Sequence, residues 1–211
     1  MASEKKKLSN KQKLTAVIVA FLIILVLSVL SIFVLEREDT PQFYTPPPCD
    51  GPFAEIDSNE DIWQDPDYLA LGDRLTVYAD KDGMADYPIS SADDLTLGRD
   101  VALLYSLIEA IRAGDHELYN SYFSDFYLRV AGERGAFTAQ KLYDIKIAYQ
   151  KTFEDEAAGF LNVYRVGYKI MDNNGSYRND IASDELRYVY FNVRSYSGYS
   201  EIYSMVYVNF N

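Results

Sequence analysis

The sequence predicts an α+β protein with an N-terminal transmembrane helix, a proline-rich acidic linker, and helices packed on an antiparallel sheet. Three observations predict this fold class. A long apolar run comes first, apolar residues then recur at three- and four-residue steps, and after Gly159 their period switches to two. Helices that precede a run of strands in this way are typical of α+β proteins.

The apolar run spans residues 14–35 and contains no charged residue, proline or glycine. It is long enough to cross a bilayer as a helix, which requires about 20 apolar residues. A cleaved signal peptide has a shorter apolar core, roughly 7–15 residues, and ends in small residues, whereas this run ends in Ile-Phe-Val-Leu. We therefore expect residues 14–35 to be an uncleaved, single-pass membrane anchor.

The charges on either side of this run predict its orientation. Residues 1–13 hold five lysines and one glutamate, a charge of +4, whereas Glu36, Glu38 and Asp39 follow the run directly. Basic segments remain on the cytoplasmic side of a membrane. We expect a plasma-membrane protein with a cytoplasmic tail of residues 1–13 and with every residue after 35 outside.

Net charge and cysteine content narrow the possible partners. The whole chain carries −12, so the part beyond the tail carries −16. Such a charge repels phosphate backbones and argues against a nucleic-acid partner. Cys49 is the single cysteine, so the external domain has no internal disulfide. This thiol is either free or forms a bridge between two chains.

Residues 36–67 are predicted to be an extracytoplasmic linker, because Pro41 and the three prolines at 46–48 favour an extended, semi-rigid spacer. The external domain then covers residues 68–211, with its core at about 93–211. The segment 50–100 is acidic, with fourteen Asp or Glu residues against three Lys or Arg. Its early apolar patch, expected to pack on the domain as a strap, comprises Trp63, Tyr68, Leu69 and Leu71.

Asp80-Lys81-Asp82-Gly83 has the spacing of part of a calcium-binding loop. In such a loop the first and twelfth positions supply ligands, and here they would be Tyr78 and Ile89. A turn between two short extended segments explains the same residues, with Gly83 supplying a positive φ. We therefore expect a turn and no metal site.

Three helices are expected between residues 90 and 153. The first is capped by Ser91 or Asp93 and ends at Gly114, the second is capped by Asp115, and the third by Thr138. Their apolar faces are, in order, Val101, Leu104, Tyr105, Ile108 and Ile111; Leu118, Tyr119, Tyr122, Phe123 and Phe126; and Leu142, Ile145, Tyr149 and Phe153.

Three strands are expected after Gly159, at residues 160–171, 186–195 and 200–210, which are rich in Tyr, Val, Ile and Phe. Asn-Asn-Gly at 173–175 predicts a turn between the first two, and Tyr-Ser-Gly-Tyr at 196–199 predicts a turn between the last two.

Residues 102–115, ALLYSLIEAIRAGD, look like the opening helix of the nuclear-transport-factor-2-like, or cystatin-like, superfamily, and residues 119–124 fit its second helix. The resemblance covers about residues 93–211 and implies a strongly curved sheet that closes over the helices as a cone. Such folds host isomerases, dehydratases, transport factors and assembly subunits, so they assign no single function. With one membrane span, the architecture is also similar to the bitopic assembly subunit of type IV secretion and conjugation machines.

The sequence contains no motif for a known catalytic chemistry. It has no Ser–His–Asp order, no glycine-rich phosphate loop after a strand and no Cys–His pairing. His116, the single histidine, falls in the first turn of a predicted helix, where an exposed structural role is favoured over acid/base chemistry. We assign no catalytic, cofactor-binding or metal-binding residue and favour a protein that is not an enzyme.

Strand parity predicts a partner surface instead. The apolar sets Val189, Phe191, Val193 and Val206, Val208, Phe210 should face the helices. Tyrosine, methionine and arginine are enriched at protein interfaces. The candidate partner face on the opposite side comprises Tyr188, Tyr190, Arg194, Tyr203, Met205 and Tyr207. The alternatives are that the acidic strap covers this face, or that the tyrosines only reflect strand propensity.

Two functions are consistent with these observations. The first is a membrane-tethered interaction or assembly module that binds a protein partner or a second copy of itself in an envelope complex. The second is a small-ligand-binding or isomerase-like pocket enclosed between helices and sheet. The pocket requires a polar side chain inside the cone, and Ser204 is the candidate.

The first testable prediction concerns topology. Protease added to intact cells should remove the domain that follows Leu35, because the lysine-rich tail holds the N-terminus inside. Immunoblots with tags at each end would measure this. A domain that stays protected until the membrane is opened would reverse the predicted orientation.

Overall fold

The computed structural model describes residues 19, 21, 24, 44–81, 83, 85–93 and 95–207. The chain divides into two compact units, Met1–Gln42 and Phe43–Asn211. The predicted cytoplasmic tail, most of the predicted anchor and linker residues 36–43 lie outside the described residues. The part of the chain that is described contains no helix both long and apolar enough to cross a membrane.

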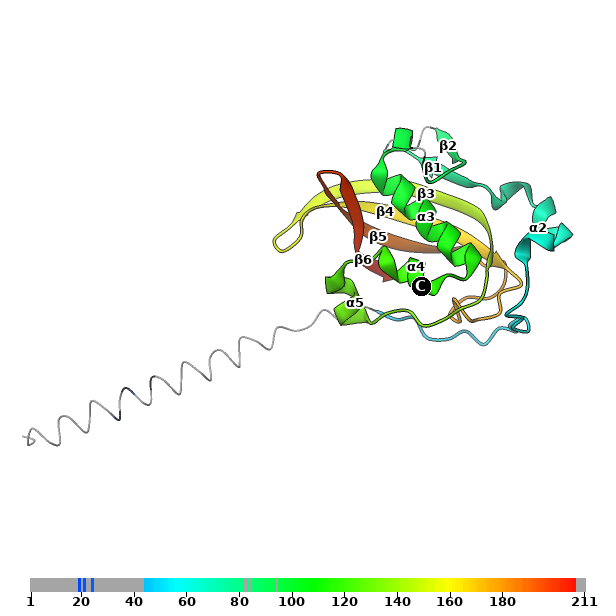
Figure 1. Ribbon diagram of the computed structural model, residues 1–211, viewed down its shortest axis with the longest axis horizontal. Helices are drawn as coiled ribbons and strands as arrows, with labels where there is room; N and C mark the ends of the chain where they lie inside the picture. Colours follow the sequence, from blue (N-terminus) through cyan, green and yellow to red (C-terminus); the bar gives the residue numbers. More distant parts are fainter. Residues whose placement is uncertain are drawn as a thin grey trace, which may run out of the picture. The chain divides into compact units, whose positions relative to one another are not determined.

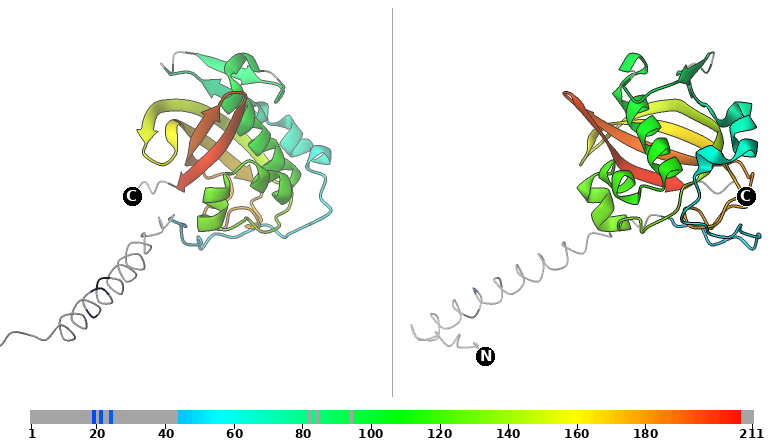
Figure 2. Two further views of the ribbon diagram at one scale, coloured as in Figure 1. Left: turned by 60° about the vertical axis from the view of Figure 1, so that its left-hand side comes forward. Right: turned by 45° about the vertical axis from the view of Figure 1, so that its right-hand side comes forward.

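The second unit is an α+β domain built on one curved, six-stranded sheet with the order β2-β1-β3-β4-β5-β6 (Figure 1). Helices α3, α4 and α5 lie on one face of this sheet (Figure 2). The elements, in chain order, are η1 Ile62–Gln64, α2 Pro66–Ala70, η2 Gly72–Arg74, β1 Thr76–Ala79, β2 Asp86–Ile89, η3 Leu95–Leu97, α3 Arg99–Ala113, α4 His116–Ser121, α5 Asp125–Ala131, β3 Lys141–Asp155, β4 Gly159–Met171, β5 Arg187–Tyr196 and β6 Tyr199–Tyr207.

The sheet is mixed, whereas the sequence predicted an antiparallel one. β1 pairs with β3 in parallel, and the other neighbouring strands pair antiparallel. The β1–β2 hairpin therefore extends the sheet beyond the predicted core of residues 93–211. Its turn is as predicted, because the Gly83 N–H donates to the Asp80 carbonyl at 3.1 Å and Gly83 has a φ of +61°.

Helix α3 packs its predicted apolar stripe against the sheet. Val101, Leu104, Ile108 and Ile111 are each at most 2% exposed. The helix ends at Gly114 as predicted, with a φ of +71°. A Cβ at this position would lie only 2.6 Å from the Ala139 nitrogen, so the close approach also requires glycine.

The predicted N-cap of this helix, Ser91 or Asp93, is wrong. The short η3 helix lies between those residues and α3, which begins at Arg99. Gly98 separates the two helices with a φ of +96°, a conformation that cannot continue a right-handed helix.

Asp100, in the first turn of α3, joins the helix to three strands. Its buried carboxylate accepts hydrogen bonds from Asn162 Nδ2 at 2.8 Å and the Tyr164 hydroxyl at 3.2 Å on β4. It also accepts from Ser195 Oγ on β5 at 2.6 Å and Ser200 Oγ on β6 at 2.7 Å. Four neutral donors thus satisfy a charge that would otherwise be costly to bury.

The second predicted helix is divided into α4 and α5. Asp115 caps α4 as predicted by accepting from the Leu118 N–H at 2.9 Å, and Ser124 caps α5 by accepting from the Tyr127 N–H at 3.2 Å. Between them the backbone adds to the edge of β6, where Phe123 forms a bridge with Ile202. This sheet contact interrupts the helix.

The predicted third helix is wrong, because residues 141–155 form strand β3. Leu142 and Ile145 are three residues apart, yet both are buried in the same core. Asp144 has a φ of +51° and lies at a bulge in the β3–β4 register, which adds one residue to the strand. The bulge converts a two-residue period into the three-residue spacing of a helix face.

The two predicted turns of the C-terminal half are confirmed. Gly175, with a φ of +74°, donates its N–H to Asn173 Oδ1 at 3.0 Å within the loop of residues 172–186 that joins β4 to β5. Tyr196 pairs with Tyr199 across the β5–β6 turn, in which Gly198 has a φ of +90°.

Truncation of Leu104 tests the core. Leu104→Ala should lower the free energy of unfolding by about 2–5 kcal/mol, the usual cost of deleting a buried leucine side chain. Leu118→Ala is the matched control, because Leu118 on α4 is 43% exposed, and it should change stability by less than about 0.5 kcal/mol. Equal shifts in a denaturant titration would contradict the assigned core.

Candidate functional site

The candidate site is the sheet face that points away from α3, α4 and α5, here called the outer face. Val189, Phe191 and Val193 of β5 are at most 3% exposed and face the helices, as predicted. The alternate residues of β5 therefore point to the outer face. They are Tyr188, Tyr190, Asn192 and Arg194.

The predicted parity of β6 is wrong. The β5–β6 register pairs Val189 with Tyr207 and Phe191 with Met205, so Tyr207 and Met205 face the core. Val206, predicted to be inside, is 41% exposed on the outer face opposite Tyr190. Predicted inward residues Val208 and Phe210 lie outside the described residues.

A bulge causes this reversal. The register moves from the pair Asn192–Ser204 to the pair Val193–Ile202, so Tyr203 is an extra residue on β6. Ser204, the candidate polar residue of the cone, instead accepts a hydrogen bond from Asn192 Nδ2 at 2.7 Å on the outer face.

Met205 and Tyr207 have partners inside the domain. The Tyr119 hydroxyl donates to Met205 Sδ at 3.8 Å, and the Arg178 guanidinium lies 4.5 Å from the centre of the Tyr207 ring. Burial raises the pKa of the Tyr207 hydroxyl above its ordinary value. These two residues therefore belong to the core and not to a partner surface.

Tyr188 and Arg165 form a stacked pair on the outer face. The Arg165 guanidinium lies 4.7 Å from the centre of the Tyr188 ring. The ring lies across Gly167, where a Cβ would be only 2.6 Å from Tyr188 Cε1. Arg165 is also the cross-strand neighbour of Tyr190. Glycine thus leaves room on the sheet for the Tyr188 ring beside the Arg165 guanidinium.

Arg194 and Tyr203 make their contacts within the domain. Arg194 Nε donates to Glu201 Oε1 at 2.9 Å, and its guanidinium lies 4.9 Å from the centre of the Tyr203 ring. Tyr203 also stacks on Phe126 of α5 with the ring centres 5.2 Å apart. Of the predicted set, Tyr188, Tyr190 and Arg194 lie on the outer face, and Tyr203 lies at its edge.

The outer face also carries several cations, which the sequence pattern did not reveal. Besides Lys141 at the end of β3, the β3–β4 register places four further cations on the same side as Tyr190. Asp86 and Asp144 pair with two of them, at 2.7 and 3.0 Å. Arg165 and Lys169 are an even number of residues apart on β4, whereas Lys146 and Lys151 share this face only because a bulge between Tyr149 and Lys151 shifts the register of β3. The four cations are Lys146, Lys151, Arg165 and Lys169.

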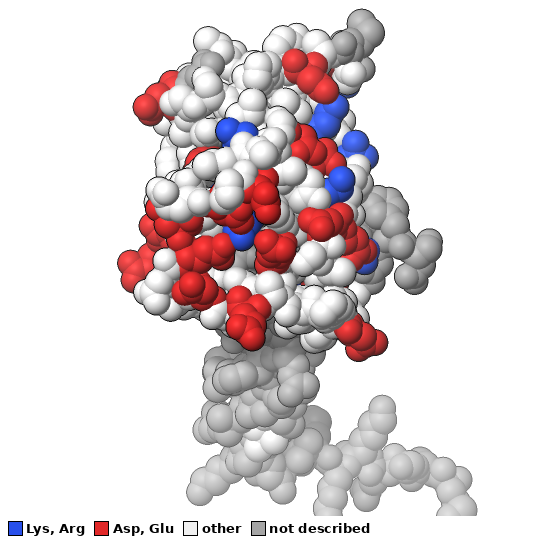
Figure 3. All heavy atoms as spheres, turned by 90° about the vertical axis from the view of Figure 1, so that its right-hand side faces the viewer, with Lys and Arg blue, Asp and Glu red and all other residues white. Residues whose placement is uncertain are grey.

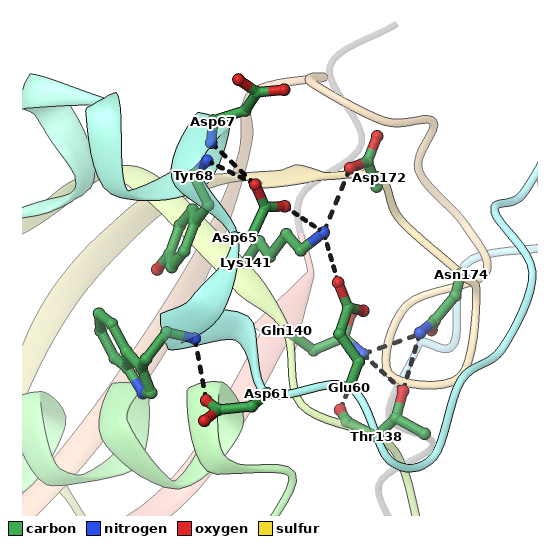
Figure 4. Close-up of polar contacts among 11 residues, drawn as sticks. Glu60, Asp61, Asp65, Asp67, Tyr68, Thr138, Gln140, Lys141, Asp172 and Asn174 are labelled. Atoms are coloured by element: carbon green, nitrogen blue, oxygen red, sulfur yellow. Dashed lines mark hydrogen bonds and ion pairs between the residues drawn. The ribbon is translucent and has the colours of Figure 1, made fainter.

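A second polar cluster fixes the segment that precedes β1 to β3 (Figure 4). This segment, from residue 44 to residue 74, is called the strap. The ammonium of Lys141 contacts carboxylate oxygens of Glu60 at 2.6 Å, Asp65 at 2.7 Å and Asp172 at 3.3 Å. The Lys141 side chain is only 8% exposed. Burial opposes its charge, but the hydrogen bonds to Asp65 and Glu60 raise the pKa of Lys141 above its ordinary value.

Asp65 serves two roles in this clamp. It contacts Lys141, and it caps α2 by accepting from the N–H groups of Asp67 at 2.8 Å and Tyr68 at 3.2 Å. The hydrogen bond from Lys141 and the backbone bond from Tyr68 hold the pKa of Asp65 below its ordinary value. The ion pair and the helix start therefore depend on one carboxylate.

The strap is anchored to the domain further along its length, as predicted for Tyr68. The Tyr68 side chain is fully buried, and its hydroxyl donates to the Leu142 carbonyl at 2.8 Å. The N–H groups of Cys49 and Ala54 donate to the carbonyls of Asn179 at 2.8 Å and Asn173 at 3.0 Å. Residues 44–67, predicted as linker, thus pack on the domain, and the Cys49 side chain is half-buried and forms no disulfide within the chain.

No family model matches the sequence, and comparisons with curated proteins and with solved structures find no match. Within the described ranges, no group of three or more His, Cys, Asp or Glu residues could hold a metal ion. The chemistry of the outer face is therefore the basis for a proposed function.

Removal of the clamp cation tests the role of Lys141. Lys141→Met should lower the free energy of unfolding by about 1.5–3 kcal/mol, the range for hydrogen bonds to charged groups. Lys146→Met is the matched control, because Lys146 pairs with Asp86 in a half-exposed ion pair worth about 0–1 kcal/mol. Equal losses in the two variants would contradict the clamp.

The loss should also depend on pH. Folding lowers the pKa of Asp65, so its contribution is complete above the unfolded value of 3.8 and is lost as the pH falls through the folded pKa. The stability difference between wild type and Lys141→Met should therefore be full at pH 7 and decline below pH 3.8. Urea titrations at pH 7 and at a pH below 3.8 measure this stability difference.

Proposed function

We propose that the protein is a membrane-anchored, extracytoplasmic interaction module that joins an envelope assembly through the outer face of its sheet. The predicted anchor at residues 14–35, with lysines before it and acidic residues after it, supports the location. The curved sheet with helices on one face supports a domain of the nuclear-transport-factor-2-like, or cystatin-like, class. The assembly subunit of type IV secretion and conjugation machines is the architectural analogue.

The observation that carries this proposal is the composition of the outer face around Tyr190. The ring has Arg165 as its neighbour on β4 and the exposed Val206 as its neighbour on β6. Aromatic and arginine side chains contribute most of the binding energy at protein interfaces. A surface with these residues at its centre and lysines at its margin has the composition of a binding site.

The charge of the face indicates the chemistry of the partner. The part of the chain beyond the tail carries −16, and acidic side chains cover much of the side where α2 lies (Figure 3). The outer face, in contrast, holds Lys146, Lys151, Arg165 and Lys169. Complementary charge accelerates encounter and selects partners. We therefore expect an acidic protein surface as the partner, which includes the acidic side of a second copy.

An isomerase-like or ligand-binding cone has less support. Ser204 points to the outer face, and the space between helices and sheet is occupied by tyrosine rings that contact one another. The centres of the Tyr119 and Tyr177 rings are 6.0 Å apart, and those of Tyr168 and Tyr177 are 6.5 Å apart. These contacts favour the interaction module.

A double charge change tests the proposed face. Tyr190→Glu with Arg165→Glu should leave the domain folded, because both side chains lie on the outer face. The same pair should reduce cross-linking of the anchored protein to its partner, or to itself, at least tenfold, since carboxylates would repel an acidic partner and require desolvation. Circular dichroism and cross-linking in cells provide the two measurements.

The matched control is Tyr87→Glu with Arg129→Glu, which changes the charge equally at exposed positions on β2 and α5. It should leave both folding and cross-linking unchanged. Met205→Glu should unfold the domain, because Met205 faces the core. If the outer-face pair unfolds the domain, or stays folded and cross-links normally, the proposed interface is wrong.

A further inference from the structure

The strap exposes a second surface of mixed apolar and acidic character, on the side of the domain where α2 lies (Figure 3). Residues 61–69 present Trp63, which is 45% exposed, and Leu69, which is 38% exposed, together with the exposed carboxylates of Asp61 and Asp67. Large apolar side chains that are exposed among polar residues are typical of interaction sites. These four residues are called the strap surface.

Trp63 is held in place by its neighbours in the strap. Its backbone N–H donates to Asp61 Oδ1 at 3.0 Å, and its ring centre lies 5.7 Å from that of the buried Tyr68. Carboxylates on both sides of Trp63 in the sequence contact Lys141. The half-exposed indole therefore loses little conformational freedom on binding, and tryptophan is enriched among the residues that contribute most to interfaces.

Both this surface and the outer face hold charges without a counter-charge in the domain. Among the described residues, Asp61 and Asp67 form no ion pair, unlike the two strap carboxylates that contact Lys141 (Figure 4). Lys151 and Arg165 of the outer face also form no ion pair in this part of the chain, although two neighbouring lysines do. Each surface thus has charges available to a partner.

The two surfaces are complementary in composition. The outer face has Tyr190 and the exposed Val206 side by side, with Arg165 next to Tyr190 on β4. The strap surface has Trp63 beside carboxylates of the opposite sign. Contact between the two would bring aromatic and apolar side chains together and place Arg165 and Lys151 against acids, which is the arrangement that selects partners at interfaces.

A chain cannot make this contact with itself while the clamp holds the strap. Lys141 is opposite Met171 of β4, whereas Tyr190 is opposite Arg165, six residues further along the same strand. Six residues of a strand span about 20 Å. Because the strap is fixed at Lys141, the Trp63 side chain does not reach the outer face of its own domain. The occupant of that face must come from another molecule.

We propose that the strap surface of one copy binds the outer face of a second copy. This inference rests on the proposed function and names the acidic partner of the outer face. The two surfaces differ, so the contact is heterologous, and copies add head to tail into a ring or an open row. The charge of −16 beyond the tail opposes association, but salt screens charges more than about 8 Å apart, whereas charges across the contact are closer.

Cross-linking of the full chain in cell membranes tests the contact with two variants. Tyr190→Glu with Arg165→Glu disables the outer face, and Trp63→Ser with Asp67→Lys disables the strap surface. Each variant expressed alone should cross-link to itself at least tenfold less than the wild type. Co-expressed with different tags, the two variants should recover cross-linking to each other, because one retains its strap surface and the other retains its outer face.

The matched control is Leu118→Ser with Glu117→Lys, which changes an exposed apolar residue and an exposed acid in the first turn of α4. It should cross-link to itself as the wild type does. Circular dichroism checks the fold of each variant. If the double strap variant does not fold, Asp67→Lys alone serves instead, since it alters one exposed side chain, and it should reduce self-cross-linking several-fold.

The outcomes separate this inference from the proposed function. Unchanged self-cross-linking of the strap variants would overturn the inference, as would failure of the two double variants to recover when co-expressed. Absence of self-cross-linking in the wild type would also overturn it, although the proposed function, which includes other acidic proteins as partners, would stand. If the outer-face variant cross-links as the wild type does, the proposed function fails, and the inference fails with it.

Discussion

The arrangement of helices and sheet depends on the hydrogen bonds that the Asp100 carboxylate accepts. It lies in the first turn of α3 and accepts hydrogen bonds from β4, β5 and β6, so it fixes the start of the helix against three strands. Four donors offset the cost of burying this charge. With α3 fixed on one side, α4 and α5 follow it onto the same side, and the outer face remains uncovered by helices (Figure 1).

The sequence predicted those elements whose signal is local. The end of α3 at Gly114, the cap at Asp115 and the turn at Gly198 each follow from the conformational preference of one residue. Two of the failures share one physical cause, which is the β-bulge. An extra residue at Asp144 gave β3 the spacing of a helix, and an extra residue at Tyr203 reversed the parity of β6. Bulges are fixed by strand pairing, which no local pattern reports.

The residues of the candidate site also divide into those with a local signal and those that depend on distant partners. The side of the sheet to which Tyr188 and Tyr190 point was predicted correctly because β5 carries no inserted residue, so its alternation continues unbroken. The groups that depend on distant partners could not be predicted. Lys141 contacts Glu60 and Asp172, which are far from it in sequence.

The clamp at Lys141 also explains why an acidic strap and a basic sheet face coexist in one domain. An acidic segment free to move would compete for exposed cations of the outer face such as Lys146 and mask them. The Lys141 side chain is 8% exposed, whereas that of Lys146 is 44% exposed, so the attraction of Lys141 is less screened by water. Carboxylates of the strap, those of Glu60 and Asp65, therefore pair with Lys141 and not with the exposed lysines of the outer face such as Lys146.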